Sequence, residues 1–257
     1  MERLKKLIIF DLDGTLAQSK MLPDGEMTAI LCDLLMKTNV AVISGASFKQ
    51  FKDQFLTTLL MCAEALSRLY IMPANGSSLY QSGQGGWKSV YEELLPKEDR
   101  IKIKQAIEQA IATAGIPLPQ RVHGELIEDR GSQVTYSACG QDAPLEVKSV
   151  WDPDHAKRQR IKKILVSLLP DFEVRIAGTT SIDVTKKGID KAYGIRKIGE
   201  HLDIPIDEML FVGDAVFPGG NDYSAKELGV ETIQVSGPDE TKKIIDDLLK
   251  KHVNESH

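Results

Sequence analysis

The chain of 257 residues contains only three cysteines, Cys32, Cys62 and Cys139. No two of them form the C-x-x-C pair that is typical of zinc and redox sites. Their odd number and wide spacing favour reduced thiols in a cytoplasmic protein over disulfides. We therefore expect neither a disulfide-rich secreted scaffold nor a zinc domain.

Positive charge and long apolar runs are also scarce. Lys and Arg number 32 against 37 Asp and Glu, a net charge of −5, which argues against a nucleic-acid partner. No segment approaches the roughly 18 consecutive apolar residues of a membrane span. The sequence has neither the phosphate-binding motif G-x-x-x-x-G-K-[ST] nor the G-x-S-x-G motif of serine hydrolases. These absences argue against a nucleic-acid-binding protein, a membrane-spanning protein, a P-loop nucleotide-binding protein and a serine hydrolase with the G-x-S-x-G motif.

What is present is the composition of an ordinary globular protein. Hydrophobic residues make up 42% of the chain and charged residues 27%. At roughly 150 residues per domain, the length predicts one large domain or two modest ones.

Short apolar segments alternate with helical patterns along much of the chain. The expected strands are Leu7–Phe10, Val40–Ile43, Leu69–Met72, Met209–Val212 and Thr232–Val235. The expected helices are Gly25–Lys37, Ser47–Leu66, Lys191–His201 and Asp239–Lys250. Such alternation predicts an α/β core with a doubly wound, Rossmann-like parallel sheet.

The middle of the chain has a different pattern. After the turn-rich stretch Gln81–Gly86, two helical segments are interleaved with short strands. The expected helices are Lys97–Ala114 and Pro153–Leu169, and the expected strands are Glu125–Glu128, Gln133–Ser137, Glu173–Ile176 and Ser181–Val184. We therefore predict an inserted α+β domain over residues 82–188, within a core formed by residues 1–81 and 189–257.

Acidic residues follow two of the expected core strands directly. LIIFDLDGTL places Asp11 and Asp13 at the end of one strand, and LFVGDAVFPGGND places Asp214 and Asp222 after another. A lone D-x-D-G-T also suits a helix cap or an Asx turn. Two acidic strand ends in one parallel sheet instead predict a shared oxygen-ligand site for Mg²⁺. The predicted ligands are Asp11, the backbone carbonyl of Asp13, and Asp214.

This arrangement suits phosphoryl transfer. Asp11 is the expected nucleophile, which would form an aspartyl-phosphate, and Asp13 the expected general acid and base. A metal would screen the repulsion between the carboxylate and an anionic phosphate. Asp222 could fix a lysine or a metal-bound water.

Phosphate binding also requires fixed hydrogen-bond donors. Ser44 and Gly45 stand at the end of another strand, where a hydroxyl and backbone N–H groups can hold phosphate, although a helix cap is an equally good interpretation of Ser44. Of Lys186, Lys187 and Lys191, we prefer Lys191 as the phosphate-binding cation because it opens a core helix.

The ordered motifs DLDGT, SGAS, the lysine that opens a late helix, and GDAVFPGGND resemble the haloacid dehalogenase superfamily of aspartate-dependent phosphotransferases. The position of the insertion resembles the type IIB cap of that superfamily. The stretches MPANGSSLY, GTTSIDVTKKGIDKAYGI and PGGNDYSAKELG extend the similarity to eukaryotic-type phosphomannomutases over nearly the whole chain. The resemblance implies that Asn221 and Asp222 support the catalytic loop.

The resemblance also implies that the cap binds the substrate. Arg130 lies where the mutases have a phosphate-binding arginine, and Ser181 and Asp183 match an S-x-D motif that binds sugar hydroxyls. Gln141 and Lys148 stand where the mutases have two further arginines. Lysine lacks the two-pronged geometry of arginine, and glutamine lacks its charge.

Because of these two departures, our leading hypothesis is an Mg²⁺-dependent phosphatase of a small phosphorylated sugar or related metabolite. The alternatives are a phosphohexomutase that uses the same aspartyl-phosphate, and a non-catalytic module whose acids hold a structural cation. Retention of Asp11, Asp13, Lys191 and Asp214 together argues against the last of these. The expected protein is cytoplasmic, and either a monomer or a homodimer formed through the cap.

Overall fold

The computed structural model describes residues 4–18, 21–117 and 119–254. The chain forms two compact units, Met1–Glu92 together with Asp190–His257, and Glu93–Ile189. Each unit has its own sheet and its own apolar core.

A seven-stranded sheet in the order β11-β10-β1-β2-β3-β4-β5 forms the centre of the first unit. Its strands are β1 (Leu7–Asp11), β2 (Asn39–Ile43), β3 (Leu69–Met72), β4 (Ser78–Gly83), β5 (Gly86–Glu92), β10 (Met209–Gly213) and β11 (Glu231–Gln234). The strands from β11 to β3 are parallel, and β4 and β5 are antiparallel additions. The predicted class, a doubly wound α/β fold, is confirmed.

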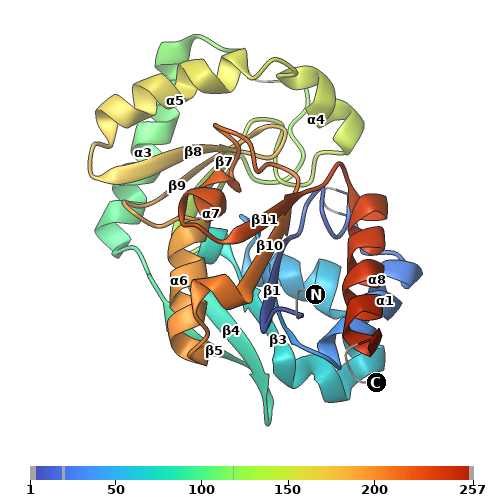
Figure 1. Cartoon of the computed structure of the whole chain (residues 1–257). Coiled ribbons are helices and arrows are strands. Elements are labelled where there is room, and N and C mark those ends of the chain that lie inside the picture. The colour runs from blue at the N-terminus through green and yellow to red at the C-terminus, as the bar shows by residue number, and fades with distance from the viewer. Residues whose placement is uncertain (1–3, 19–20, 118, 255–257) are drawn as a thin grey trace. The chain divides into compact units, whose positions relative to one another are not determined.

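Helices cover both faces of this sheet. The helical elements of the unit are α1 (Gly25–Leu35), α2 (Phe48–Phe51), η1 (Lys52–Leu56), η2 (Thr58–Arg68), η3 (Ala74–Gly76), α6 (Lys191–Leu202), η4 (Ile206–Glu208), α7 (Tyr223–Glu227) and α8 (Pro238–Asn254). Ile8 and Phe10 belong to the apolar cluster that includes α1 and α8, which lie side by side (Figure 1). Leu7 and Ile9 belong to a second cluster that includes α6. The run LIIF is apolar throughout because both faces of β1 are buried.

The β4–β5 hairpin moves the first boundary between the units. The expected boundary after residue 81 is wrong, because β5 pairs with β4 and the chain leaves the sheet only after Glu92. The expected second boundary, after residue 188, differs by one residue from the observed one. The stretch from Gly83 to Gly86 is the turn of this hairpin, and Gly85 has a φ of 91°, which favours glycine.

The expected helix over Ser47–Leu66 is divided into three short pieces. Ser47 begins it with a capping box, in which its hydroxyl accepts from Gln50 N and the Gln50 side chain accepts from Ser47 N. The chain then continues as α2, the π-helical η1 and the 3₁₀-helical η2, and Cys62 has non-helical backbone angles. One continuous α-helix is therefore a wrong prediction for this segment.

The second unit combines an antiparallel sheet with helices. The sheet order is β6-β7-β9-β8, with β6 (Ile127–Asp129), β7 (Gln133–Ser137), β8 (Phe172–Ala177) and β9 (Ser181–Lys186). The helices are α3 (Lys97–Ala114), α4 (Leu145–Trp151) and α5 (Ala156–Leu168). Of these, α3 and α5 contact the sheet. The sequence predicts α3 with its observed bounds, starts α5 too early, and misses α4. The α+β character of this unit agrees with the prediction.

A disulfide links two helical elements of the first unit. The sulfur atoms of Cys32 in α1 and Cys62 in η2 are bonded, and their Cα atoms are 5.7 Å apart. Cys139 is a free, buried thiol. The expectation of reduced thiols is wrong for Cys32 and Cys62, because the fold packs α1 against η2, a contact that sequence spacing does not reveal. The cytoplasmic location, which we inferred from that expectation, stays a prediction.

The disulfide should contribute measurably to stability. Its two cysteines are 30 residues apart, and closing a loop of this length in the unfolded chain corresponds to about 3–4 kcal/mol. We expect the Cys32→Ser, Cys62→Ser double variant to lose roughly 10 °C in melting temperature. Reductant should lower the melting temperature of the parent similarly and leave that of the double variant unchanged. A parent that does not respond to reductant would contradict this prediction.

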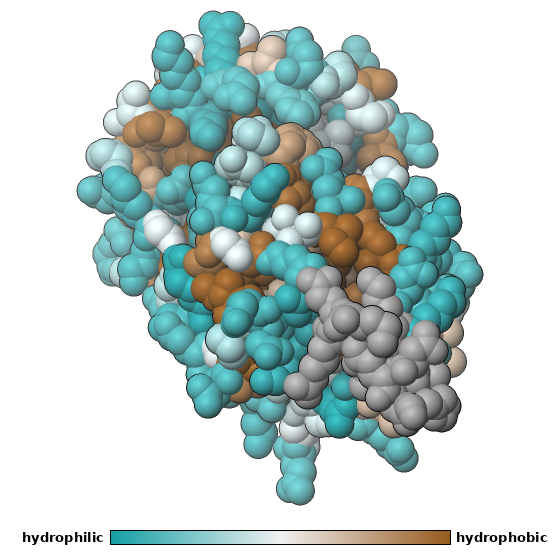
Figure 2. Space-filling model, in the orientation of Figure 1, coloured by the Kyte–Doolittle hydropathy of each residue, from teal (hydrophilic) through white to brown (hydrophobic). Residues whose placement is uncertain are grey.

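Hydrophilic side chains cover much of the surface that Figure 2 shows, and apolar side chains gather in smaller patches between them. Among the described residues, no helix combines the length and the apolar character needed to cross a membrane.

Candidate active site

Three parallel strands of the first unit end in polar residues at one edge of the sheet. Asp11 is the last residue of β1, Ser44 follows β2 directly, and Asp214 follows β10 directly. β1 lies between β2 and β10 and is paired in parallel with both. The predicted convergence of these strand ends therefore agrees with the sheet order.

A buried lysine joins two of the predicted acidic residues. The Lys191 ammonium donates to Asp11 Oδ1 and to Asp222 Oδ1. All three side chains are nearly inaccessible, with side-chain exposures of 1% for Lys191, 5% for Asp11 and 0% for Asp222. Lys191 is the first residue of α6, which is capped by Asp190 through a 2.8 Å bond from Tyr193 N. The cap fixes the start of the helix and thereby the position of the lysine.

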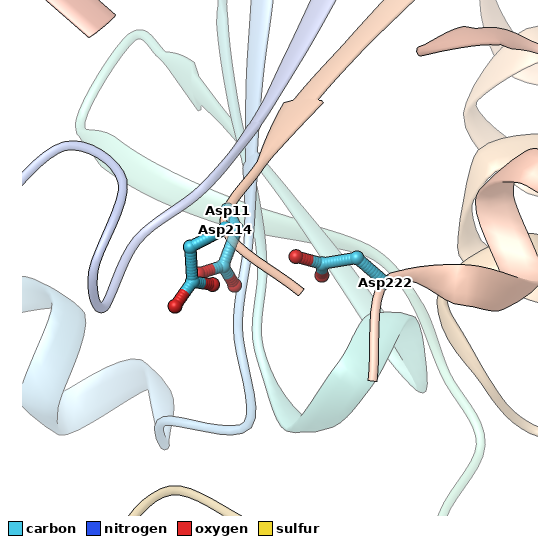
Figure 3. A group of neighbouring side chains, drawn as sticks. All are labelled: Asp11, Asp214 and Asp222. Atoms are coloured by element: carbon cyan, nitrogen blue, oxygen red, sulfur yellow. The ribbon is translucent and has the colours of Figure 1, made fainter. Parts of the chain in front are cut away.

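Asp214 completes a cluster of three carboxylates. One oxygen each from Asp11, Asp214 and Asp222 lie within 4.8 Å of one another. Figure 3 shows the Asp11 and Asp214 side chains next to each other, with the Asp222 carboxylate directed toward them from a separate segment. Two of the predicted ligands, Asp11 and Asp214, are thus close together, and the backbone carbonyl of Asp13 stays a predicted third ligand. Asp222, which the sequence assigns to a supporting role, is the third carboxylate of the cluster.

The electrostatics of the cluster favour binding of a cation. Burial raises the pKa of the Asp11 carboxyl well above its ordinary value, although Lys191 opposes the shift. Burial and the charge of Asp222 likewise raise the pKa of Asp214. Burial alone would lower the pKa of Lys191, but the two carboxylates outweigh it and the pKa is raised. Three carboxylates face one ammonium here, so the donor set fits a hard divalent cation.

Two glycines let the backbone approach these carboxylates closely. A Cβ on Gly14 would lie 2.5 Å from Asp214 Oδ2, and the φ of Gly14 is 84°. A Cβ on Gly213 would lie 2.4 Å from Asp222 Oδ2. The glycines of DLDGT and VGD are therefore required by the packing of the cluster.

The predicted phosphate loop lies after β2. Ser44 is buried, and its Oγ accepts a 3.1 Å hydrogen bond from Ala46 N. The hydroxyl does not cap the next helix, because Ser47 does so. Since an acceptor bond leaves the hydroxyl proton available for donation, Ser44 can still donate to a phosphate oxygen. Gly45 lies between these residues in the same loop.

The remaining predicted residues are Asp13 and Asn221 of the first unit and the alternative lysines Lys186 and Lys187. Asp13 is half-buried, and its charge contributes to the raised pKa of Asp214. Asn221 is half-buried in the loop before α7. Lys186 and Lys187 are exposed on the second unit, where Lys186 pairs with Glu93 at 3.4 Å. Of the three lysines considered, Lys191 is the one that contacts the carboxylate cluster.

In the second unit, three of the predicted substrate residues lie together. The Arg130 guanidinium donates to Glu128 Oε2 from Nε at 3.0 Å and from Nη2 at 2.6 Å. Its Nη2 also lies 3.4 Å from Gln141 Oε1, and Lys148 Nζ donates to the Gln141 backbone carbonyl at 3.2 Å. The structure thus groups the three positions that the resemblance assigns to phosphate binding.

Ser181 and Asp183 lie on one face of β9. Ser181 Oγ is 2.8 Å from Ser137 Oγ, and Asp183 Oδ1 accepts from Thr135 Oγ1 at 2.8 Å. Thr135 and Gln133, which donates to it, are polar side chains that sequence reasoning missed. The polar alternation of Gln133, Thr135 and Ser137 within the predicted strand is the signal that could have identified them.

Comparisons with known proteins identify the family. The model of the family described as eukaryotic phosphomannomutase matches residues 27–251. A phosphomannomutase of Encephalitozoon cuniculi is 26% identical over 253 residues, covering 96% of this chain and 94% of that protein.

Solved structures show the same fold at lower identity. A truncated IMP-nucleotidase of Plasmodium falciparum has a TM-score of 0.73 at 19% identity, covering 95% of this chain and 70% of that one. A haloacid dehalogenase-like hydrolase of Bacteroides thetaiotaomicron has a TM-score of 0.65 at 17% identity, covering 95% and 99%. The chain is an enzyme of the haloacid dehalogenase superfamily, and within that superfamily it belongs to the eukaryotic phosphomannomutase family.

Proposed function

We propose that the protein is a phosphohexomutase, which moves a phosphoryl group between two positions of a phosphorylated hexose. The similarity to phosphomannomutases over nearly the whole chain carries this proposal, and the buried Asp11–Lys191–Asp222 contacts support it. The mutase, our alternative from the sequence, therefore moves ahead of the phosphatase, because the comparisons give the phosphatase no specific support.

The proposed reaction uses Asp11 as the nucleophile. An Asp11 oxygen attacks phosphorus of a hexose bisphosphate, the sugar oxygen leaves with a proton from Asp13, and an aspartyl-phosphate forms on Asp11. A hydroxyl of the hexose then gives its proton to Asp13 as its oxygen attacks the aspartyl-phosphate, and Asp11 is released. Ser44, Gly45 N–H and Lys191 would hold the phosphate oxygens throughout.

The carboxylate cluster is the proposed site for Mg²⁺. Asp11, Asp214 and the backbone carbonyl of Asp13 would hold the ion, and Asp222 would fix Lys191 beside it. When bound, the ion would neutralise the charge that the carboxylates and a phosphate bring together.

The second unit is the proposed substrate-binding cap. Ser181 and Asp183 would bind sugar hydroxyls, and Arg130, Gln141 and Lys148 would bind the distal phosphate. The oligomeric state, either a monomer or a cap-mediated homodimer, stays a prediction. The cytoplasmic location and a small phosphorylated sugar as the substrate also stay predictions.

A phosphohydrolase is the second candidate, and the residues beside Arg130 favour it. Gln141 offers no charge for a phosphate, and the Arg130 guanidinium is already paired with Glu128. A mutase has to hold a bisphosphate by either end, whereas a phosphatase binds its substrate in one orientation and admits water.

A single assay separates the two candidates. Hexose monophosphates are supplied with Mg²⁺ and a hexose bisphosphate activator, and both isomer formation and free phosphate are followed. We expect interconversion of the 1- and 6-phosphates to be faster than phosphate release, and to stop when the metal is removed with a chelator. If phosphate release is faster, the protein is the hydrolase. If neither isomer nor free phosphate is formed, both candidates are refuted.

Substitution of Gln141 by arginine should strengthen binding of the hexose bisphosphate that the mutase reaction requires. Gln141→Arg adds a second guanidinium beside Arg130, where the Glu128 carboxylate offsets part of the added charge. A two-pronged contact to the distal phosphate should improve affinity for a hexose bisphosphate by about 10-fold. Titration of the bisphosphate activator in the coupled assay measures this change. Gln159→Arg, on the exposed side of α5, adds the same charge elsewhere and should have no effect; equal effects of both variants would contradict the assignment.

A further inference from the structure

The sheet of the second unit has one apolar and one polar face. Figure 1 shows α3 and α5 on the same side of β7, β8 and β9. Residues at alternate positions of β7 and β9, namely Val134, Tyr136, Ile182 and Val184, enter the apolar core on that side. Because side chains alternate along a strand, the residues between them face the other way. The second face is therefore polar, and it carries both Ser181 and Asp183.

A chain of hydrogen bonds crosses this polar face. Gln133 Nε2 donates to Thr135 Oγ1 at 2.8 Å, and Thr135 Oγ1 donates to Asp183 Oδ1 at 2.8 Å. All three side chains are buried, with exposures of 0%, 2% and 3%. Thr135 and Asp183 are also direct partners in the β7–β9 ladder.

The chemistry of the three groups fixes the direction of these bonds. An amide nitrogen only donates, and an ionised carboxylate only accepts. The Thr135 hydroxyl has one proton, so the bond from Gln133 occupies an acceptor site of the oxygen and directs that proton to Asp183. A bond to a charged acceptor is stronger than one between neutral groups, and threonine has few χ1 rotamers.

We propose that Thr135, itself held by Gln133, is a positioning residue that orients the Asp183 carboxylate for accepting hydrogen bonds from the hydroxyls of a sugar phosphate. This inference rests on the proposed function, in which Asp183 contacts the sugar. It assigns a task to the buried side chains of Gln133 and Thr135, which the proposed reaction itself does not use.

Thr135→Val tests the inference, because it keeps the shape of the side chain and removes the hydroxyl. With a hexose monophosphate as the varied substrate, we expect KM to rise about 10-fold while kcat stays within about threefold, since the sugar contact is the same in the ground and transition states. Thr135→Ser retains a hydroxyl and should bring KM back to within about threefold of the parent. An unchanged KM in Thr135→Val would overturn the proposal.

A double-mutant cycle tests whether the effect passes through Asp183. In an Asp183→Ala background, Thr135→Val should have no further effect on KM, because the group that it orients is gone. A rise as large as in the parent background would refute the positioning role. Thr185→Val is the matched control: it removes a hydroxyl two residues from Asp183 whose bond goes to the Ile189 carbonyl, and it should leave KM unchanged.

A readout without substrate separates this inference from the proposed function. In crystal structures without substrate, the Asp183 carboxylate should occupy one rotamer in the parent and in Thr135→Ser, and more than one in Thr135→Val, because the donor that orients it is lost. An unchanged single rotamer in Thr135→Val would overturn the positioning role whatever the enzyme does. A parent that turns over no hexose phosphate, with the rotamers changed as expected, would instead refute only the proposed function and leave the orientation of Asp183 established.

Discussion

Replacing Asp11 by asparagine should reduce kcat by at least about 10³-fold and leave the fold intact. The amide has nearly the same shape as the carboxylate but is a far poorer nucleophile, so the first phosphoryl transfer cannot proceed at a useful rate. The measurement is kcat at saturating hexose phosphate and Mg²⁺, with circular dichroism and a melting curve as tests of folding.

Two further variants make the result specific to position 11. Asp33→Asn makes the same chemical change on the exposed side of α1 and should have full activity. Asp13→Asn should also lose turnover, yet still allow Asp11 to be phosphorylated by a reactive phosphoryl donor, because the nucleophile remains. Activity of Asp11→Asn within tenfold of the parent, after mass spectrometry has excluded deamidation, would refute the assignment of the nucleophile.

Lys191→Met should cost both activity and stability. The variant leaves the buried Asp11 and Asp222 carboxylates without their ammonium partner. Removing one partner of a buried ion pair typically lowers the free energy of unfolding by about 3–5 kcal/mol. Urea unfolding at neutral pH, in the presence of a chelator, measures the loss. Lys187→Met, at an exposed position, should change the free energy of unfolding by less than about 0.5 kcal/mol.

The loss of stability in Lys191→Met should become smaller as the pH falls. Burial raises the pKa of Asp11, and the charge of Lys191 lowers it. Removing the lysine should therefore raise the pKa of Asp11 further. A carboxyl with a raised pKa in the folded state takes up its proton there before it does so in the unfolded chain, which stabilises the fold at lower pH. The difference between variant and parent should therefore narrow from neutral pH toward the ordinary aspartate value of 3.8. A difference that is constant over this range would contradict the ion pair.

The sequence indicates which residues meet in the carboxylate cluster of the first unit, for a local reason. Asp11, Ser44 and Asp214 follow buried strands directly, and a parallel sheet brings such strand ends to one edge. Lys191 is identified in the same way, since it opens a helix after the capping residue Asp190. In each case, neighbouring residues in the chain carry enough information.

Features that depend on distant contacts are not predictable in this way. In the β4–β5 hairpin only the first two residues of β4 are buried, and the turn-rich stretch between the strands resembles a linker in the sequence. Pairing of Cys32 with Cys62 requires knowledge of how α1 packs against η2. The role of Thr135 depends on its register with Asp183 on β9, 48 residues further along the chain.

The strand order of the first unit also has a consequence for synthesis on the ribosome. β1 emerges first, but its neighbour β10 begins only at Met209, after all of the residues 93–189 that form the second unit. We expect this second unit, which is continuous in the chain, to fold as the nascent chain lengthens, while one edge of β1 is still unpaired. Such an edge can pair with another chain and aggregate until β10 covers it. Asp11 meets Lys191 and Asp214 only at this late stage, so the nascent protein completes its carboxylate cluster among its last folding steps.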